Sequence, residues 1–351
     1  MEKENETLSL YESVKLAICR GIYEGTWQDG ERIPTERRLT ETLGVSRITV
    51  RKALEQMEKE GVIERTQGSG TRVTLKCEAH SGSMDIITLI APAHNAFFSR
   101  LIDAIELRAE QEDALVLYRQ KPDGMTLAQC LFRIYEKGLR NVILWKEGMD
   151  LPPEAMKRLC ALGMRMVLFD STRHTPYADA VTLDNPDAVR RLIECLRARG
   201  CRRPAYVGWD AAEIDSVPER ENAFRTLCPQ GTVVRVPYLY HSRPEDIPPE
   251  TRRRLLEQTA SCDGFLFGVG ELAAALLSSA ESGPRRPAAA IGGAPGVRET
   301  DMLILEQDFP GMAEKMFELL KTQNTSGSGW QAGTYRLPGL CAFGMKGEEG
   351  S

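Results

Sequence analysis

Residues 31–73 read ERIPTERRLTETLGVSRITVRKALEQMEKEGVIERTQGSGTRV, and this stretch decides the fold of the N-terminal part of the chain. Thr35 can cap a short helix, because a threonine hydroxyl accepts the unpaired N–H groups of a first turn, and Gly44 can end that helix. Ser46 can cap a longer helix in the same way, with Gly61 as its end. The stretch therefore predicts two helices in close succession.

The residues on either side complete a small domain. Residues 9–24 repeat apolar side chains at helical spacing, and residues 62–65 and 71–75 read as two strands around a glycine-containing turn. Three helices followed by a hairpin form a winged helix-turn-helix. This domain is predicted over residues 1–75, and the polar, aperiodic residues 76–83 (KCEAHSGS) are predicted to be a linker.

The distribution of charge sets this region apart. The whole chain carries a formal net charge of -5, which is unusual for a protein that binds DNA. Residues 1–31 hold three Lys/Arg against seven Asp/Glu, whereas residues 32–76 hold ten Lys/Arg against six Asp/Glu. The predicted helix-turn-helix and wing thus carry a local net charge of +4 (ten minus six), which suits a phosphate backbone.

Three motifs within the quoted stretch resemble the DNA-binding domain of the GntR family of bacterial transcription regulators. They are P-T-E-R at the second helix, G-V-S-R-x-T-V-R-K-A-L in the third, and E-G-V-I-E-R-x-Q-G-x-G-T in the wing. The resemblance implies that the third helix enters the major groove of double-stranded DNA with its N-terminus, and that the wing tip approaches the minor groove. The predicted DNA-contacting residues are Arg37, Ser46, Arg47, Thr49, Arg51, Gln67, Gly68 and Gly70.

Strand-like and helix-like segments alternate along the remainder of the chain, residues 84–351. The predicted strands are 85–91, 114–119, 141–145, 165–169, 180–183, 204–208, 232–236, 263–267, 287–291 and 302–305. The predicted helices are 97–112, 126–137, 153–162, 185–200, 217–227, 248–260, 270–281 and 308–323. This alternation predicts parallel sheets covered by helices on both faces, and the length predicts two lobes. Residues 322–329 (TQNTSGSG) are predicted to be a flexible loop.

Several segments of this region, in their order along the chain, resemble the core of LacI-type sugar repressors, which is related to type I periplasmic binding proteins. They include DIITLIAPAHNAFFSRLIDAIE (85–106), VTLDNPDAVRRLIECLRARGCRRPAYVG (181–208), SVPERENAF (216–224) and LILEQDFPGMAEKMFELL (303–320). Together with the winged helix, the chain resembles arabinose-repressor-like GntR members. The resemblance implies a small-molecule effector between the lobes and a homodimer held together by the first lobe.

Candidate effector-binding residues lie just after predicted strands, where ligands sit in parallel α/β folds. Aromatic side chains can stack on a sugar or base face, and Arg or Asp can fix a ligand by charge-assisted hydrogen bonds. Asp184 and Arg220 are predicted to face the same gap, whereas Phe97 and Phe267 are explained equally well as core residues. The full set of candidates is Phe97, Phe98, Arg173, Asp184, Trp209, Arg220, Phe267 and Glu271.

One departure from the sugar-repressor pattern concerns residues 291–295, which read Ile-Gly-Gly-Ala-Pro. Such repressors usually carry an aspartate at this place, where it accepts the protons of ligand hydroxyls. Its absence makes an anionic or phosphorylated sugar somewhat more attractive than a neutral one. It is also consistent with a pocket that has lost its ligand.

The predicted function is sequence-specific regulation of transcription by a cytoplasmic homodimer, which represses and responds to a small, polar, carbohydrate-like effector. A constitutive DNA-binding regulator with a vestigial pocket is one alternative. An enzyme on the same α/β core has less support, because the sequence contains no GxxxxGK[ST], GxSxG or HExxH motif.

Cysteine and histidine usage predicts neither a metal site nor a cofactor. The nine cysteines include no CxxC pair, and the four histidines are scattered. The cysteines are therefore predicted to be unpaired thiols of a reducing compartment, with Cys77 in the linker as the most reactive one. The absence of a signal-like N-terminus and of any run of roughly 18 apolar residues predicts a protein without membrane partners.

Overall fold

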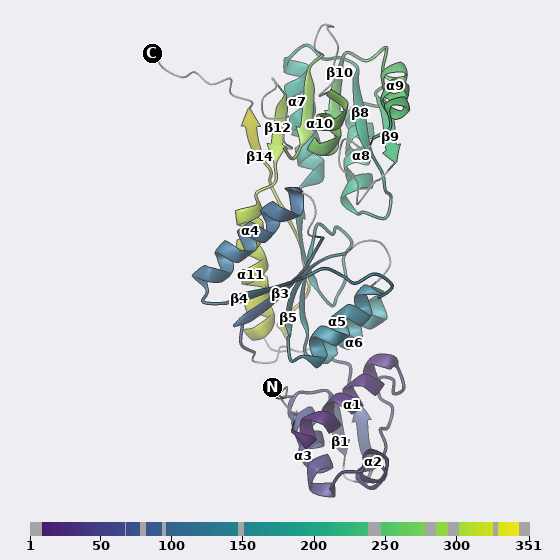
Figure 1. Ribbon diagram of the computed structural model, residues 1–351, viewed down its shortest axis with the longest axis vertical. Helices are drawn as coiled ribbons and strands as arrows, with labels where there is room; N and C mark the ends of the chain where they lie inside the picture. The colour runs from purple at the N-terminus through teal and green to yellow at the C-terminus, as the bar shows by residue number, and fades with distance from the viewer. Residues whose placement is uncertain are drawn as a thin grey trace, which may run out of the picture.

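The computed structural model describes residues 9–66, 68–77, 82–92, 96–146, 151–237, 247–277, 286–293, 302–325 and 329–343. Three units follow one another along the long axis: a small N-terminal unit, a central lobe and a distal lobe (Figure 1). The N-terminal unit carries a two-stranded sheet, and each lobe is built around a six-stranded sheet. Within the described residues, no helix combines the length and apolar character that crossing a bilayer requires.

The N-terminal unit is a winged helix-turn-helix, as the sequence predicts. Its elements are α1 (Leu10–Glu24), α2 (Glu36–Leu43), α3 (Arg47–Lys59) and the antiparallel strands β1 (Ile63–Thr66) and β2 (Gly70–Val73). The Thr35 hydroxyl accepts a hydrogen bond from the Arg38 N–H, and the Ser46 hydroxyl accepts one from the Thr49 N–H. Both predicted helix caps are therefore confirmed.

The central lobe contains a parallel sheet with the strand order β13-β7-β6-β5-β3-β4. Its strands are β3 (Ile86–Ile90), β4 (Leu115–Arg119), β5 (Asn141–Trp145), β6 (Arg165–Phe169), β7 (Asp179–Leu183) and β13 (Thr334–Leu337). Its helices are α4 (Ala96–Gln111), α5 (Leu127–Glu136), α6 (Pro153–Ala161) and α11 (Phe309–Thr325). Ile143 packs on one face, with α4 and α11, whereas Val142 packs on the other, with α5 and α6. Helices therefore cover both faces, as predicted.

The distal lobe has the strand order β14-β12-β11-β10-β8-β9, and its pairs are parallel except for the antiparallel β14. Its strands are β8 (Pro204–Asp210), β9 (Thr232–Pro237), β10 (Gly264–Phe267), β11 (Ala288–Ile291), β12 (Leu303–Glu306) and β14 (Leu340–Phe343). Its helices are α7 (Asn185–Ala198), α8 (Ser216–Leu227), α9 (Pro249–Gln258) and α10 (Gly270–Leu277). Within the described residues the chain crosses between the lobes from β7 to α7, from β12 to α11 and from β13 to β14.

Two predictions about the C-terminal part are wrong. The structure adds strands β13 and β14, which the sequence did not predict. The predicted loop over 322–329 begins inside α11, which continues to Thr325, and residues 326–328 lie outside the described residues. The helix continues because Gln323 and Asn324 are buried and hydrogen-bonded to the central sheet, so their polarity does not mark a loop.

The prediction that every cysteine is an unpaired thiol is also wrong. Cys77, directly after the wing, forms a disulfide with Cys160 of α6, and the two Cα atoms are 5.3 Å apart. The pairing could not be read from spacing, because 83 positions separate the two cysteines along the chain. The wing and the central lobe are thus covalently joined in this structure.

Candidate DNA-reading surface and interlobe site

The start of α3 is an exposed surface. Arg47 and Ile48, its first two residues, are exposed, and Ile48 keeps 80% of its surface accessible. Ser46 and Thr49 are engaged with each other, since their hydroxyl oxygens lie 2.8 Å apart and the Ser46 hydroxyl also caps the helix. Arg47 and Ile48 are therefore the side chains most available for contact with a ligand. Ser46 and Thr49 instead stabilise the first turn of α3.

Two further candidate arginines flank this surface. Arg37 lies on α2 with its Nε 3.8 Å from Glu41 Oε1, and Arg51 lies on α3 with an Nη 3.5 Å from Glu36 Oε2. Exposed ion pairs of this length contribute little, so both guanidinium groups can exchange their carboxylate for a phosphate. Glu36, which sequence reasoning missed, also pairs with Arg65 of β1 at 2.6 Å and so links α2 to the wing.

The wing turns through two glycines in the left-handed region, Gly68 at φ 79° and Gly70 at φ 86°. Residues with a Cβ are strained at these angles, so the turn depends on glycine at both positions. Gln67, the remaining candidate of the wing, lies outside the described residues. The hairpin is anchored by Arg72, whose guanidinium donates to the Gly30 carbonyl at 2.7 Å.

A polar network joins the two lobes at the end of β6. The Ser171 hydroxyl donates to Asp215 Oδ2 at 2.7 Å, and the Ser216 hydroxyl donates to Asp170 Oδ2 at 2.9 Å. Arg173 adds an ion pair of 2.7 Å with Asp215 Oδ1. Asp170 is buried with a left-handed φ of 54°, and burial raises the pKa of its carboxyl to about 6. The lobes are thus joined by reciprocal hydrogen bonds between their own side chains.

Arg220 of α8 is buried and donates two hydrogen bonds to protein groups. Its Nε donates to Asn185 Oδ1 at 2.6 Å, its Nη1 donates to the Gly268 carbonyl at 2.8 Å, and only 4% of its surface is exposed. Asp184 instead caps α7 by accepting the Asp187 N–H at 3.0 Å. Arg220 therefore contacts Asn185, the residue next to Asp184, and the hypothesis that Asp184 and Arg220 grip one ligand stays a prediction.

An open hollow of about 780 Å³ lies between the loop after β6, the start of α7 and one side of α8 along its whole length. It gathers Arg173 and Asp184 from the predicted set, and Arg220 is not among the described residues that line it. Its charged lining consists of the carboxylates Asp184, Asp187, Asp215 and Glu219 and the guanidinium groups of Arg173 and Arg190. Three of these carboxylates already form ion pairs: Asp215 with Arg173, Asp187 with Arg190, and Glu219 with Arg336. Among the described residues Asp184 forms no ion pair, so its carboxylate is the lining acceptor best placed for a hydroxyl or ammonium donor.

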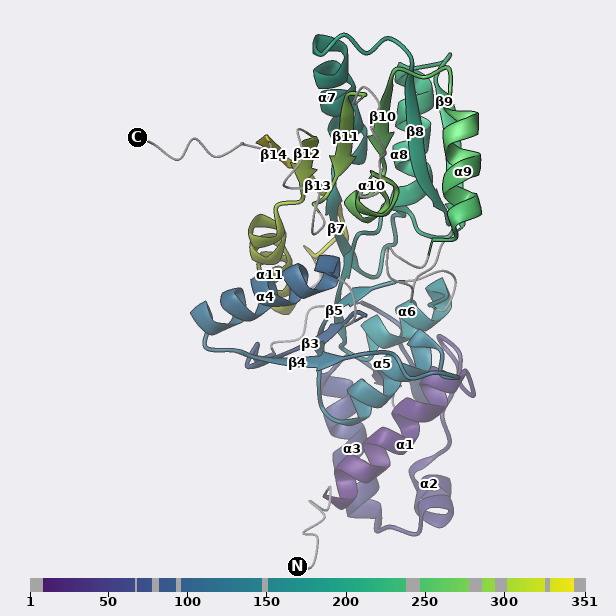
Figure 2. The same cartoon turned by 45° about the horizontal axis from the view of Figure 1, so that its top comes forward.

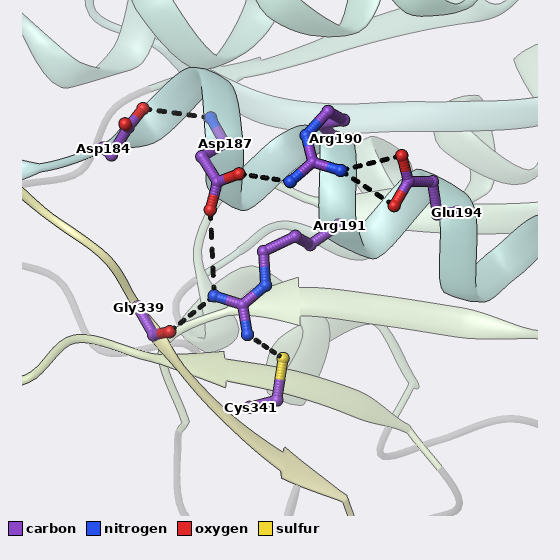
Figure 3. Close-up of polar contacts among 7 residues, drawn as sticks. All are labelled: Asp184, Asp187, Arg190, Arg191, Glu194, Gly339 and Cys341. Carbon is purple, nitrogen blue, oxygen red and sulfur yellow. Dashed lines mark hydrogen bonds and ion pairs between the residues drawn. The ribbon is translucent and has the colours of Figure 1, made fainter.

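Helix α7 connects this hollow to the crossing into β14 (Figure 3). Arg190 pairs with Asp187 and also with Glu194, at 2.8 Å. Arg191 donates to the Gly339 carbonyl at 2.6 Å and to the Cys341 sulfur at 2.8 Å. Arg191 also lies 3.8 Å from Asp187 Oδ2, so one side chain contacts both the lining of the hollow and the segment that enters β14.

The remaining candidates lie elsewhere. Phe98 and Phe267 are core residues, and Phe97 packs at 5.3 Å from Phe309, so the core interpretation holds for these rings. Trp209 is partly buried against the core at the end of β8. Glu271 begins α10, and burial raises its pKa. The structure therefore does not gather the eight predicted effector residues into one site.

A carboxylate is present near the place where the sugar-repressor aspartate is missing. Glu306, at the end of β12, is buried and accepts the Gly293 N–H at 3.1 Å. Glu306 also forms an ion pair of 2.6 Å with Arg100 of α4, so it links the lobes. Sequence reasoning missed Glu306 because it belongs to the neighbouring strand.

The comparisons with known proteins agree with both parts of the structure. Residues 10–73 match the model described as "Bacterial regulatory proteins, gntR family". The histidine utilization repressor of Klebsiella aerogenes is 32% identical over 129 residues, which are 36% of this chain and 52% of that protein. The chain thus spans about half the length of this curated relative.

Solved structures resemble the two-lobed part. The Cra transcriptional dual regulator from Pseudomonas putida, in complex with fructose 1-phosphate, has a TM-score of 0.62 at 16% identity, covering 75% of this chain and 100% of that chain. A periplasmic binding protein/LacI transcriptional regulator from Alkaliphilus metalliredigens QYMF, complexed with D-xylulofuranose, has a TM-score of 0.60 at 13% identity, covering 74% and 97%. The chain therefore joins a winged helix that matches the gntR family model of bacterial regulatory proteins to a two-lobed domain whose fold is like that of LacI-type regulators and periplasmic binding proteins.

Proposed function

We propose that this protein is a sequence-specific DNA-binding transcription regulator that acts as a repressor. The observation that carries the proposal is the exposed start of α3, Arg47 and Ile48, within the stretch that matches the gntR family. Helices presented in this way read base edges in the major groove. The matched family and the named relatives are transcription regulators, which supports a regulator over an enzyme.

The test is selection of binding sequences from a random pool of duplex DNA at fixed salt concentration. Enrichment of one motif with two half-sites is expected, because a single winged helix buries little surface and pairing raises affinity. Binding that enriches no motif, and that salt abolishes equally for all sequences, would contradict specific readout.

The effector proposed for the hollow beside α7 and α8 is rich in hydroxyl groups and is not an anion. Both lining arginines are already paired, Arg173 with Asp215 and Arg190 with Asp187, whereas Asp184 forms no ion pair among the described residues. Of the two structural neighbours named above, one was solved with the sugar D-xylulofuranose and the other with the sugar phosphate fructose 1-phosphate, which supports a carbohydrate-like ligand. The proposal thus keeps the carbohydrate class and gives up the preference for a phosphorylated one.

Asp184→Asn tests this assignment, because asparagine still caps α7 but carries no charge. A thermal-shift screen of neutral and amino sugars identifies the ligand, and titration calorimetry compares wild type with variant. A loss of affinity of about tenfold or more is expected, since hydrogen bonds to a charged group are the stronger ones. Equal affinities would remove Asp184 from the site.

A constitutive DNA-binding regulator is the second candidate function. It is favoured by Arg220, whose hydrogen bonds to Asn185 and Gly268 already use two of its guanidinium nitrogens. In this case no sugar would raise the melting temperature, while specific DNA binding would persist. One sugar that both stabilises the protein and changes its DNA affinity would exclude this candidate.

A further inference from the structure

The winged helix packs directly against the central lobe. Helix α1 lies next to α5 and α6 in both views (Figures 1 and 2). The Tyr23 and Phe132 rings are stacked, with their centroids 4.1 Å apart and an interplanar angle of 8°. The Tyr135 hydroxyl lies 3.3 Å from the Cys19 sulfur, and both residues are fully buried. The hydrophobic core of the winged helix thus continues into the lobe.

Polar contacts surround this apolar centre. Arg20 of α1 pairs with Glu136 of α5, and Arg158 of α6 donates to the Tyr23 carbonyl at 3.1 Å. Lys157 lies 3.5 Å from Asp29, in the turn that precedes α2. An apolar centre with a polar rim is the usual composition of a specific interface, so the winged helix and the central lobe form a specific interdomain interface.

The Cys77–Cys160 pair lies where the wing meets the same helix, α6. Cys77 follows β2 and is partly exposed, whereas Cys160 is buried in α6. Their Cα separation of 5.3 Å falls within the range of about 4.4–6.8 Å that disulfides require. Docking of the winged helix is therefore what brings these two distant cysteines together.

We propose that Cys77 and Cys160 form a reversible thiol–disulfide tether that locks the winged helix onto α6. The oxidant is a low-molecular-weight disulfide. The Cys77 thiolate attacks it, forming a mixed disulfide and releasing one small thiolate; the Cys160 thiolate then attacks the Cys77 sulfur and releases the second. Two protein thiols lose two electrons and two protons, and the small disulfide becomes two thiols. A small dithiol reverses the exchange.

The tether fixes the orientation of α3 relative to the central lobe. If that lobe forms the dimer contact of the proposed regulator, the oxidised protein holds its two recognition helices at one spacing. The reduced protein keeps only the noncovalent contacts, so it can adapt to other spacings. This consequence rests on the proposed function, whereas formation of the tether does not.

The first experiment equilibrates the full-length protein with mixtures of reduced and oxidised glutathione and quantifies the Cys77–Cys160 peptide by mass spectrometry. The equilibrium gives the effective concentration of one thiol near the other. A flexible connection gives about millimolar values, and the docked pair is expected to exceed this by about tenfold or more. A millimolar or lower value, or Cys77 linked only to glutathione, would overturn the proposal.

Interface variants test whether docking causes this proximity. Phe132→Ala removes the ring stacked on Tyr23, and Arg20→Gln removes the ion pair with Glu136 without opening a cavity. Both should lower the effective concentration, Phe132→Ala by about tenfold. Leu256→Ala, on α9 of the distal lobe and 52% exposed, is the matched control and should leave it unchanged. A high value that neither interface variant lowers would overturn docking as the cause.

The second experiment measures binding to duplexes that carry two copies of the selected half-site at different spacings. The oxidised protein should prefer one spacing by about tenfold, and the reduced protein and Cys77→Ser should prefer it less. Cys341→Ser, which removes an exposed thiol of β14, should respond to oxidation like wild type. Identical preferences in both redox states would overturn the regulatory role. Absence of specific binding in both states, with the tether formed, would instead contradict the proposed function.

Discussion

Arg47 stands exposed at the first position of α3, whereas Asp170 lies buried between the lobes in a left-handed conformation. An exposed guanidinium keeps its donors available for a ligand. A buried carboxylate must be satisfied by neighbours or take up a proton, and Asp170 accepts the Ser216 hydroxyl while its pKa rises to about 6. These two residues therefore give the clearest single-residue tests.

Arg47→Ala is expected to weaken binding to the selected sequence by about 1–3 kcal/mol, the usual value of a bidentate contact to a base. Binding to random DNA should change much less, so the specificity ratio falls. Fluorescence titration at fixed salt measures both affinities. Lys59→Ala, at the opposite end of α3, is the matched control and should leave the ratio unchanged. A specificity ratio that Arg47→Ala also leaves unchanged would show that this side chain reads no base.

Asp170→Asn is expected to remove a pH-dependent loss of stability. The folded pKa of about 6 lies above the ordinary value of 3.8, so the unfolded chain releases its proton first as the pH rises. Wild-type stability therefore falls between about pH 4 and pH 6, by up to about 3 kcal/mol, and the variant cannot titrate there. Asparagine also tolerates the left-handed φ. Urea unfolding from pH 4 to pH 7 measures the free energy of unfolding of both proteins. The stability of the wild type relative to the variant should fall as the pH rises. A difference between the two proteins that stays constant with pH would exclude this ionisation.

The exposed position of Arg47 at the start of α3 was easier to predict than the contacts of Arg220 between the lobes. Arg47 follows a helix cap directly, so its place depends on neighbours in sequence. Arg220 depends on Asn185, which is 35 positions away and accepts its Nε–H. Side chains after parallel strands share an edge of the sheet, but their partners are chosen by packing, which chain order does not contain.

At the scale of helices and strands, prediction succeeded where one face of an element is apolar. Strands β5 and β6 are buried on both faces and were predicted with their observed bounds. Strand β13 is only partly buried and pairs with β7 at the end of its sheet, so its sequence, Thr-Tyr-Arg-Leu, lacks an apolar run. Helix α11 was predicted too short because Gln323 and Asn324 look like loop residues but are buried.

Gln323→Ala tests the buried end of α11. The Gln323 side chain accepts the Met166 N–H at 3.1 Å, and its Nε2 donates to the Met166 carbonyl at 3.0 Å and to Asp179 Oδ2 at 2.7 Å. Removing it leaves buried backbone groups unpaired, so the free energy of unfolding should fall by about 2–4 kcal/mol. Thr325→Ala, exposed two residues later, should change it by less than about 0.5 kcal/mol in the same urea titration. Equal losses of stability in Gln323→Ala and Thr325→Ala would show that the hydrogen bonds of Gln323 do not stabilise the end of α11.

At the scale of the molecule, the division into a winged helix and two lobes follows from charge, length and alternation of elements. The packing of the winged helix against α5 and α6 could not be predicted in this way, because the sequence gives no sign that Tyr23 and Phe132 contact each other rather than the cores of two separate domains. The residues 76–83 look like a flexible linker by composition. The structure instead joins Cys77 to Cys160, so the linker begins at a fixed point on the lobe.

The outer edge of the central lobe is where we expect two copies of the chain to associate. Leu115 and Leu117 of β4 are 70% and 44% exposed, and β4 is the last described strand of its sheet. Exposed leucines on an edge strand invite pairing with another chain, and a two-fold axis lets the same patch serve both partners. Leu115→Asp should therefore convert a dimer into a monomer at micromolar concentration, because a charge would be buried against its symmetry mate.

Light scattering measures the mass, and Leu256→Asp, on the exposed face of α9, is the matched control. The monomeric variant should also lose the preference for paired half-sites while keeping weak binding to one. A Leu115→Asp protein that remains a dimer would place the contact elsewhere.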